Sequence, residues 1–289
     1  MPIDCSAASK LRLPVRGEDL SLKFIHITDS HVGETVDTLL YLYAYGRALS
    51  AALAHIARHD RHGAAFIAHT GDMICTSSRP ESYEGARTIY GLEGEAPAPG
   101  PLVSRAHGLD MPWYYIPGNA DDRDACRARI FPRGPRHGLF NYSWEIGGIR
   151  FLSLDWGTWK TDVYTLEPSA FAWLETQLQQ SVPTIILTHH PPVHVGVEMF
   201  DRMTPEDLPR LQNLIRNSSV TAVFHGHTHY PWETRIGQVP VFGTGSITFR
   251  LSYDEGPPHL KLFPPQYRVV TVQDDGSVST EVWELESPV

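Results

Sequence analysis

Residues that commonly bind metal ions recur in five short clusters along this chain of 289 residues. The clusters are Asp29-Ser-His31, Gly71-Asp72, Gly118-Asn119, His189-His190 and Gly226-His227-Thr-His229. Carboxylate, amide and imidazole groups together suit Mn, Fe, Zn or Co better than an all-oxygen calcium site. The residue types therefore predict a centre that holds two divalent metal ions, without selecting among those four metals.

Each residue type fits a different position in such a centre. Asp29 and His31 could bind one ion, while the two carboxylate oxygens of Asp72 could bridge both ions. The other predicted ligands are Asn119, His189, His227 and His229. Two cations roughly 3.5–4 Å apart can bind phosphoester oxygens, lower the pKa of a bridging water and stabilise an in-line displacement. We therefore expect phosphoester hydrolysis with a bridging hydroxide as nucleophile.

Short apolar runs precede all five clusters and predict the strands that must position them. These runs cover residues 22–28, 65–69, 113–116, 184–187 and 220–224. Helical periodicity connects several of them, over residues 35–59, 167–180 and 205–217. The carboxyl ends of parallel strands share one edge of a sheet, so we expect the five clusters to converge there.

Further strands toward the C-terminus complete the predicted fold. They cover residues 140–146, 149–154, 239–242, 267–273 and 278–284, and Gly147-Gly148 marks a hairpin. We predict an α/β fold, namely a four-layer α/β/β/α sandwich of two mixed β-sheets flanked by helices. One domain would span residues 1–289, with an N-terminal arm at 1–20 and a C-terminal extension of the β structure at 254–289. Residues 91–108 and 254–265 are rich in proline and glycine and predict loops.

Composition limits the partners of this protein. The net charge of −9 argues against broad binding to nucleic acid or to an anionic membrane, because both need a basic surface. No apolar run approaches the length of a membrane span, and the three cysteines suggest no disulfide framework. We therefore expect a cytoplasmic enzyme with a small-molecule substrate.

The five clusters, in this order, resemble the calcineurin-like metallophosphoesterase family over roughly residues 22–250. The resemblance implies that Asp29, His31, Asp72 and His229 hold the first metal. It implies that Asp72, Asn119, His189 and His227 hold the second. The sequence THHPP at 188–192, followed by Met199 and Asp201, is similar to class III cyclic-nucleotide phosphodiesterases and related bacterial glycerophosphodiesterases. Small phosphodiesters are therefore the expected substrates.

One position departs from the family pattern. The block that usually reads Gly-Asn-His-Asp has Ala120 in place of the histidine, which in relatives lies near the scissile phosphate. Alanine cannot protonate a leaving group, and Asp121 would lack the partner it normally orients. Either the enzyme relies naturally on its metals, or the substitution inactivates it. In both cases we expect alkyl diesters to lose more rate than aryl diesters, which have better leaving groups.

The remaining site predictions concern catalysis and substrate contacts. The predicted catalytic residues are Asn119, Asp121 and His190. The predicted substrate contacts are His194, Phe200 and Ala120. Three alternatives remain open: a phosphomonoesterase or nucleotidase of the same family, a metal-binding scaffold without chemistry, and a nuclease. The chain could form a homo-oligomer, with residues 254–265 at the interface.

Overall fold

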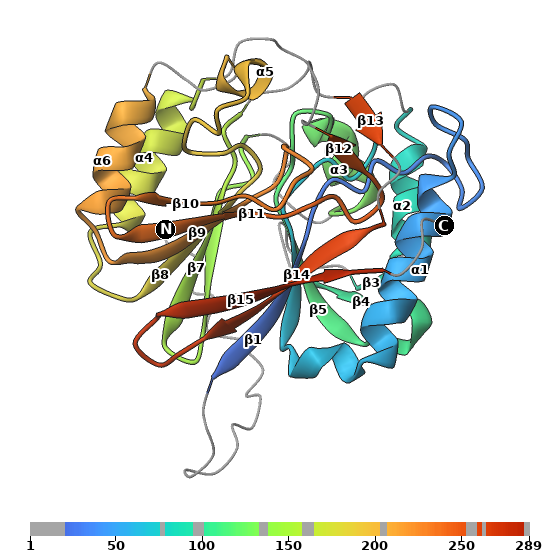
Figure 1. The fold of residues 1–289 in the computed structure, drawn as a ribbon, viewed down its shortest axis with the longest axis horizontal. Helices are drawn as coiled ribbons and strands as arrows, with labels where there is room; N and C mark the ends of the chain where they lie inside the picture. The colour runs from blue at the N-terminus through green and yellow to red at the C-terminus, as the bar shows by residue number, and fades with distance from the viewer. Residues whose placement is uncertain are drawn as a thin grey trace.

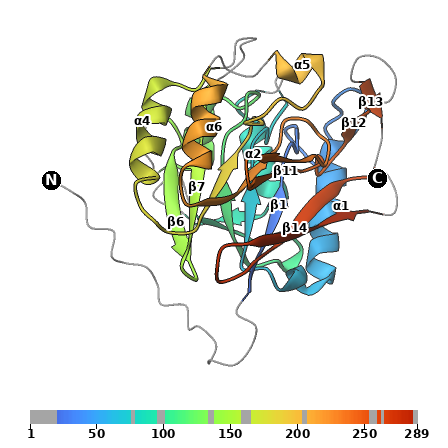
Figure 2. The ribbon, with the colours of Figure 1, turned by 60° about the vertical axis from the view of Figure 1, so that its left-hand side comes forward.

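Two β-sheets lie face to face in the middle of the protein, and helices cover their outer faces (Figures 1 and 2). The structure is a computed structural model, and it describes residues 21–75, 79–94, 101–132, 138–157, 165–202, 207–252, 259–261 and 264–285. The predicted α/β sandwich of two mixed sheets is confirmed. The predicted arm at 1–20 and most of the segment 254–265 lie outside the described residues.

The first sheet has seven strands in the order β15-β14-β1-β2-β5-β4-β3. Their bounds are Leu22–Ile27 (β1), Phe66–His69 (β2), Leu92–Glu93 (β3), Leu102–Ser104 (β4), Met111–Tyr115 (β5), Gln266–Val272 (β14) and Val278–Glu284 (β15). The three central strands are parallel, with Ile25 beside Ile67 and Ile67 beside Trp113. Strand β14 runs antiparallel to β1 and makes the sheet mixed.

The second sheet has six strands in the order β10-β11-β9-β8-β7-β6. Their bounds are Tyr142–Ile146 (β6), Ile149–Leu154 (β7), Thr184–Thr188 (β8), Val220–His225 (β9), Glu233–Ile236 (β10) and Val239–Gly243 (β11). Strands β7, β8, β9 and β11 are parallel, whereas β6 and β10 run antiparallel at the two edges. A separate pair joins β12 (Arg250–Ser252) to β13 (His259–Lys261).

Helices cover the two outer faces. Their bounds are Tyr45–Arg58 (α1), Ser82–Ile89 (α2), Arg123–Arg129 (α3), Pro168–Gln177 (α4), Glu198–Asp201 (α5) and Leu208–Arg216 (α6), with short 3₁₀ turns at Asp60–Gly63 (η1) and Ala106–Gly108 (η2). The first three helices pack on the first sheet, and α4 and α6 pack on the second. Among the described residues, no helix is both long and apolar enough to cross a membrane.

An aromatic core joins the two sheets. Phe24 and Phe66 of the first sheet stack with their ring centroids 5.0 Å apart. Phe151 and Phe224 of the second sheet meet the Phe24 ring edge-on, at 5.7 and 5.4 Å. All four side chains are fully buried, and burial of each contributes about 1.5–3 kcal/mol. This packing fixes the two sheets against each other and thereby fixes the ends of their strands.

The helix predicted over residues 35–59 is wrong over residues 35–44. Helix α1 begins only at Tyr45, because Tyr41 and Leu42 have φ angles of 50° and 74°. Those angles interrupt a right-handed helix. Val36 and Leu39, which suggested an apolar face, are exposed. The segment 91–108, expected to be a loop, contains β3, β4 and η2 among its described residues.

Candidate metal centre

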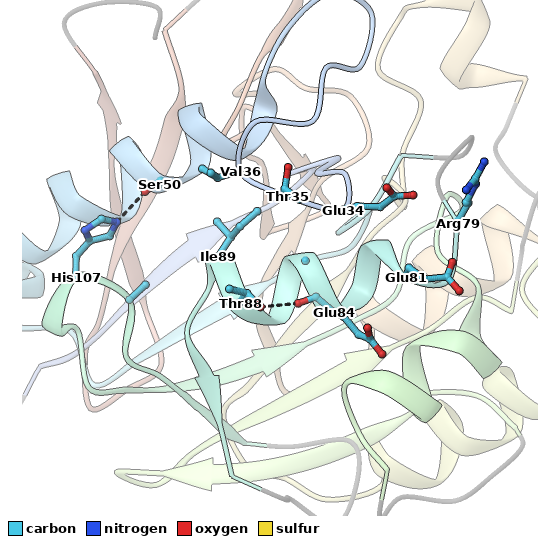
Figure 3. A pocket seen from close by; sticks show the side chains of 12 residues that line it. Glu34, Thr35, Val36, Ser50, Arg79, Glu81, Glu84, Thr88, Ile89 and His107 are labelled. Carbon is cyan, nitrogen blue, oxygen red and sulfur yellow. Dashed lines mark hydrogen bonds between the residues drawn. The ribbon is translucent and has the colours of Figure 1, made fainter.

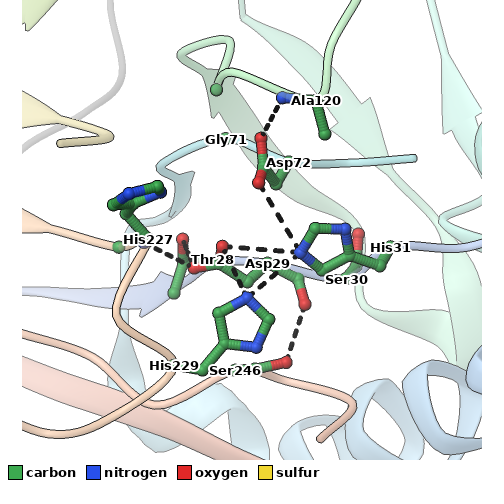
Figure 4. A network of polar contacts seen from close by, with 12 residues as sticks. Thr28, Asp29, Ser30, His31, Gly71, Asp72, Ala120, His227, His229 and Ser246 are labelled. Carbon is green, nitrogen blue, oxygen red and sulfur yellow. Dashed lines mark hydrogen bonds and ion pairs between the residues drawn. The ribbon is translucent and has the colours of Figure 1, made fainter. Parts of the chain in front are cut away.

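The predicted ligands follow strands of both sheets, and Figure 4 shows Asp29, His31, Asp72, His227 and His229 close together. Asp29 and His31 follow β1, Asp72 follows β2 and Asn119 follows β5. The three other ligands follow strands of the second sheet: His189 follows β8, and His227 and His229 follow β9. The structure therefore brings all seven predicted ligands to the seam between the sheets, at the carboxyl ends of parallel strands.

One group of ligand atoms gathers around Asp29, whose side chain is fully buried. The Nε2 atom of His229 lies 3.2 Å from Asp29 Oδ1 and 3.1 Å from the Nε2 atom of His31. His31 Nε2 lies 3.6 Å from both Asp29 Oδ1 and Asp72 Oδ2. These four atoms are the ones that a first cation would need.

A second group lies on the other side of Asp72. His189 Nε2 is 3.5 Å from Asp72 Oδ2 and 3.1 Å from the side-chain oxygen of Asn119. The rings of His189 and His227 meet edge-on with centroids 5.1 Å apart. Asp72 Oδ2 thus approaches a histidine of each group, as a bridging carboxylate would.

Five of the seven predicted ligands have a strained backbone. Positive φ angles between 44° and 68° occur at Asp29, His31, Asp72, His227 and His229. Such angles cost about 1–3 kcal/mol each for residues other than glycine, and they concentrate at functional sites. These five residues adopt a backbone conformation that costs stability. The cost indicates that the fold maintains the position of their side chains despite local backbone strain.

Two glycines let the ligand loops approach each other. A Cβ atom on Gly118 would lie 2.1 Å from Asp72 Oδ1, and one on Gly226 would lie 1.9 Å from Thr28 Oγ1. Only glycine fits at such distances, because the atoms in the way belong to side chains that hold the site together. Thr28 Oγ1 itself donates a 2.6 Å hydrogen bond to Asp29 Oδ2.

The carboxylates of the site attract positive charge. Burial alone would raise the pKa of Asp29, but His229 and His31 more than offset burial and hold the pKa well below its usual range. Burial would likewise lower the pKa of His31, yet Asp29 and Asp72 raise it to about 9. Without a metal, His31 therefore keeps a proton, and its positive charge balances the carboxylates of Asp29 and Asp72.

The same balance operates around Asp72. His189 outweighs burial and lowers the pKa of Asp72 to about 2, and in return the pKa of His189 rises to about 9. A metal ion would displace these protons. Asp29 Oδ1 is buried, and the imidazoles of His229 and His31 lie 3.2 and 3.6 Å from it, so a cation could take the place of their protons. The residues present thus fit a pair of divalent metal ions.

The segment after β11 holds Asp29 in place, a role that was not predicted from the sequence. Ser246 Oγ donates a 2.7 Å hydrogen bond to the carbonyl oxygen of Asp29. Thr248 Oγ1 donates hydrogen bonds to the carbonyl oxygens of Asp29 and Ser30, at 3.3 and 3.1 Å. The run of small hydroxyl residues between 244 and 248 was the available signal, because such side chains often bond nearby backbone.

Asp121 has partners, contrary to the sequence-based expectation. It is fully buried, and its Oδ2 atom accepts hydrogen bonds from Asp72 N at 2.7 Å and Gly118 N at 2.9 Å. The hydroxyl of Tyr115 donates to the same oxygen at 2.5 Å, and that of Tyr83 donates to Oδ1 at 3.3 Å. Asp121 therefore positions the loops that carry Asp72 and Asn119, and it presents no free oxygen to a substrate.

The other predicted site residues lie in different surroundings. Ala120 is buried, and its backbone N–H donates a 2.8 Å hydrogen bond to Asp72 Oδ1. His190 packs between Trp156 and His227, with ring centroids 5.1 and 4.8 Å away. Phe200 is only 2% exposed and contacts His227, so its ring offers little surface to a substrate. His194 is exposed and lies 3.7 Å from Asp201.

A cavity of about 900 Å³ lies away from the predicted ligands, beside helices α1 and α2 (Figure 3). Its lining includes Glu34, Arg79, Glu81 and Glu84, and a 2.9 Å hydrogen bond joins Ser50 Oγ to His107 Nε2 at its far end. None of the seven predicted ligands lines it. This cavity is therefore separate from the candidate metal centre.

Comparison with known proteins shows which sequences the chain is similar to. A family model described as calcineurin-like phosphoesterase matches residues 22–231. The chain is 24% identical over 230 residues to a probable cyclic nucleotide phosphodiesterase of Rhodococcus erythropolis, covering 78% of this chain and 70% of that protein. It is 27% identical over 211 residues to the glycerophosphodiester phosphodiesterase GpdQ of Enterobacter lignolyticus, covering 68% of each.

Solved structures share the fold at low identity. A dimetal phosphatase from Danio rerio has a TM-score of 0.59 and 13% identity, over 90% of this chain and 98% of that one. The purple acid phosphatase PPD1 from yellow lupin seeds has the same TM-score and identity, over 96% of this chain and 53% of that one.

Proposed function

Because the chain belongs to the calcineurin-like phosphoesterase family, we propose that it hydrolyses small phosphodiesters with the help of two divalent metal ions. The observation that carries this proposal is the approach of Asp72 Oδ2 to His31 on one side and to His189 on the other. Candidate substrates are cyclic nucleotides and glycerophosphodiesters, the classes named in two relatives. The family predicted from the five clusters is confirmed by the match over residues 22–231.

The proposed roles follow from the two groups of ligands. Asp29, His31 and His229 would hold the first ion, and Asn119, His189 and His227 the second, with Asp72 shared. Bound cations of this kind polarise phosphoryl oxygens and activate water for in-line attack. The chain itself contributes geometry. Its strained loops hold the buried carboxylates and the imidazoles in position before any substrate arrives.

Among the described residues of the loop after β5, neither Ala120 nor Asp121 offers a proton to the leaving group. Ala120 carries no acidic proton, and the oxygens of Asp121 already accept hydrogen bonds from backbone and tyrosine donors. We therefore infer that the leaving alkoxide takes its proton from water. This inference predicts a strong dependence of the rate on the leaving group, with aryl diesters cleaved faster than alkyl diesters.

Two measurements on the full-length chain test the proposal together. One is the metal content per chain after loading with Mn²⁺, and the other is hydrolysis of an aryl phosphodiester compared with the matching monoester. We expect about two metals per chain and a preference for the diester. Preference for the monoester would instead support a phosphomonoesterase of the same family. Bound metals without cleavage of either substrate would favour the scaffold alternative.

The metal identities, the cytoplasmic location, the single-domain organisation and the homo-oligomer stay predictions. The proline-rich segment suggested for an interface lies mostly outside the described residues. Elemental analysis of the protein as isolated would show which metals it selects, and light scattering would give its oligomeric state.

A further inference from the structure

A phenylalanine ring packs against the ligand histidines on each side of the candidate metal centre. Phe249 lies on the side of the first group, with its ring centroid 4.5 Å from that of His229 and 5.6 Å from that of His31. Phe200 lies on the side of the second group, 5.2 Å from the ring of His227. Both phenylalanines are at least nine-tenths buried.

The ring of Phe249 is held from behind and from its own backbone. Tyr45 at the start of α1 stacks on it with centroids 4.7 Å apart and an angle of 22° between the rings. The backbone N–H of Phe249 donates a 3.1 Å hydrogen bond to Ser246 Oγ, the same hydroxyl that bonds the carbonyl of Asp29. One segment therefore fixes both a ligand and the ring that covers two other ligands.

Phe200 is supported differently. It belongs to α5, a single helical turn between β8 and α6, and its neighbour Asp201 accepts hydrogen bonds from Val195 N at 2.7 Å and Gly196 N at 3.0 Å. These bonds tie α5 to the loop that begins at the ligand His189. The ring of Phe200 thus depends on the loop after β8, whereas the ring of Phe249 depends on the segment after β11.

We propose that Phe249 is a positioning residue for the first metal ion and Phe200 a positioning residue for the second. Each ring fixes the orientation of imidazoles that bind one ion and keeps water from that side. The inference rests on the two-metal centre of the proposed function and deepens it, because it assigns separate control of the two ions to two residues. Neither residue needs to touch the substrate.

Substitution of groups that orient metal ligands typically weakens metal affinity about 10–100-fold. We therefore expect Phe249→Leu to weaken the affinity for the first ion by that factor. We expect Phe200→Leu to weaken the affinity for the second ion equally. Leucine keeps both sites apolar, so the change removes the flat ring without adding a polar group. A matched control is Phe171→Leu on α4, a buried phenylalanine whose ring lies beneath Arg210, away from the ligands.

The experiment measures Mn²⁺ affinity of the full-length chain by electron paramagnetic resonance of free Mn²⁺ in two backgrounds. Asn119→Ala removes a ligand of the second ion, and His229→Ala removes a ligand of the first. In the Asn119→Ala background, Phe249→Leu should weaken the remaining ion while Phe200→Leu leaves it unchanged. In the His229→Ala background, the effects should be exchanged. Phe171→Leu should change neither affinity, although it lowers the unfolding temperature.

Two results would overturn the inference. One is an equal loss of Mn²⁺ affinity at both sites on either phenylalanine substitution. The other is an unchanged Mn²⁺ affinity in all variants whose unfolding temperature matches that of the Phe171→Leu control. Failure of the proposed function is distinguishable from both. In that case the unsubstituted chain binds Mn²⁺ but cleaves no diester, while the phenylalanine variants still show the residue-specific pattern of Mn²⁺ affinity. A chain that binds no Mn²⁺ would refute both statements.

Discussion

At the scale of single residues, Asp121 shows how one buried side chain can organise a site that it does not enter. Its carboxylate collects donors from the loop after β2, from the loop after β5 and from two tyrosines. Burial raises the pKa of Tyr115 well above its usual value, so the phenol stays protonated and keeps donating. The distance between Asp72 and Asn119 is thus set by a residue behind them.

Replacement of Asp121 by alanine should therefore destabilise the protein strongly. Several buried donors would lose their acceptor, at about 1–3 kcal/mol each, so we expect a loss of at least about 3 kcal/mol. Urea denaturation of the metal-free chain measures this loss. Asp122→Ala is a useful comparison, because Asp122 only caps α3 through Asp124 N and Ala125 N and should cost about 1 kcal/mol. Equal losses for the two variants would contradict the positioning role of Asp121.

Ala120 gives a second prediction at this scale. Introduction of histidine, as Ala120→His, would restore an acid near the position of the leaving group. We expect the rate for an alkyl diester to rise by up to about 100-fold, and that for an aryl diester to rise far less. Parallel kinetics on the two diesters, with metal content measured in the same samples, tests this. Equal gains for both substrates would show that the histidine does not act on the leaving group.

At the scale of elements, three histidines connect the end of α1 to the last two strands. His55 Nδ1 and His62 Nε2 lie 2.9 and 2.8 Å from the hydroxyl of Tyr267. Trp283 of β15 packs against His62 with ring centroids 4.4 Å apart. Burial lowers the pKa of His62, and the neighbouring His59 and His55 lower it further, while Glu281 opposes them and Lys23 adds to the lowering.

The direction of that shift fixes a pH dependence. Because the folded pKa of His62 lies below its unfolded value, the unfolded chain binds the proton more readily. The contribution of His62 is therefore present above about pH 6.5 and is lost as the pH falls below it. We expect His62→Gln to flatten the decrease of the unfolding free energy just below pH 6.5. Denaturation curves at several pH values measure this, with His107→Gln as a control outside the cluster, and an unchanged slope would refute the prediction.

The elements also show what sequence could and could not predict. The buried strands before each ligand cluster were identifiable because their apolar runs stop at polar residues, and β7 and β15 match their predicted bounds. Helix α2 was missed because it is short and contains Gly85, a poor helix former. The glycine is required there, since a Cβ atom would lie 2.2 Å from the carbonyl oxygen of Glu34. Such a contact between distant segments leaves no local pattern.

In the site, too, some residues could be predicted from the sequence and others could not. Ligand types and their order along the chain were enough to propose seven metal ligands, and the structure brings those residues together. The supporting residues were not predictable, because Ser246, Thr248 and Phe249 act through contacts with residues about 200 positions earlier. The burial of Phe200, which was predicted as a substrate contact, was not predictable for a related reason: it depends on packing against His227.

At the scale of the whole molecule, one arginine crosses from the first sheet to the second. Arg268 of β14 is fully buried and donates to the carbonyl oxygen of Gly243 in β11 at 2.9 Å. Its other terminal nitrogen donates to Glu233 at 2.9 Å and to Thr280 at 2.6 Å. The guanidinium also lies 5.3 Å from the ring centroid of Phe242. These contacts join the sheets near the end that carries the ligands.

The two partners of this ion pair should respond differently to substitution. Arg268→Met would leave the buried carbonyl of Gly243 without this donor, so we expect a loss of about 1–3 kcal/mol. Glu233 has a side chain that is 61% exposed, and Glu233→Gln should cost less than about 1 kcal/mol. Chemical denaturation of the two variants provides the comparison. A larger loss for Glu233→Gln would show that the ion pair, and not the link between sheets, matters for stability.

The position of β1 has a consequence for folding during synthesis on the ribosome. This strand lies between β2 and β14, which come from opposite ends of the chain. On the ribosome, β1 emerges early and must wait for residues 266–272 before its second edge is covered. The hydroxyls that fasten Asp29 arrive almost as late. A nascent chain therefore exposes this unpaired strand edge until residues 266–272 emerge, and the backbone of Asp29 is not held in place before residues 246–248 emerge.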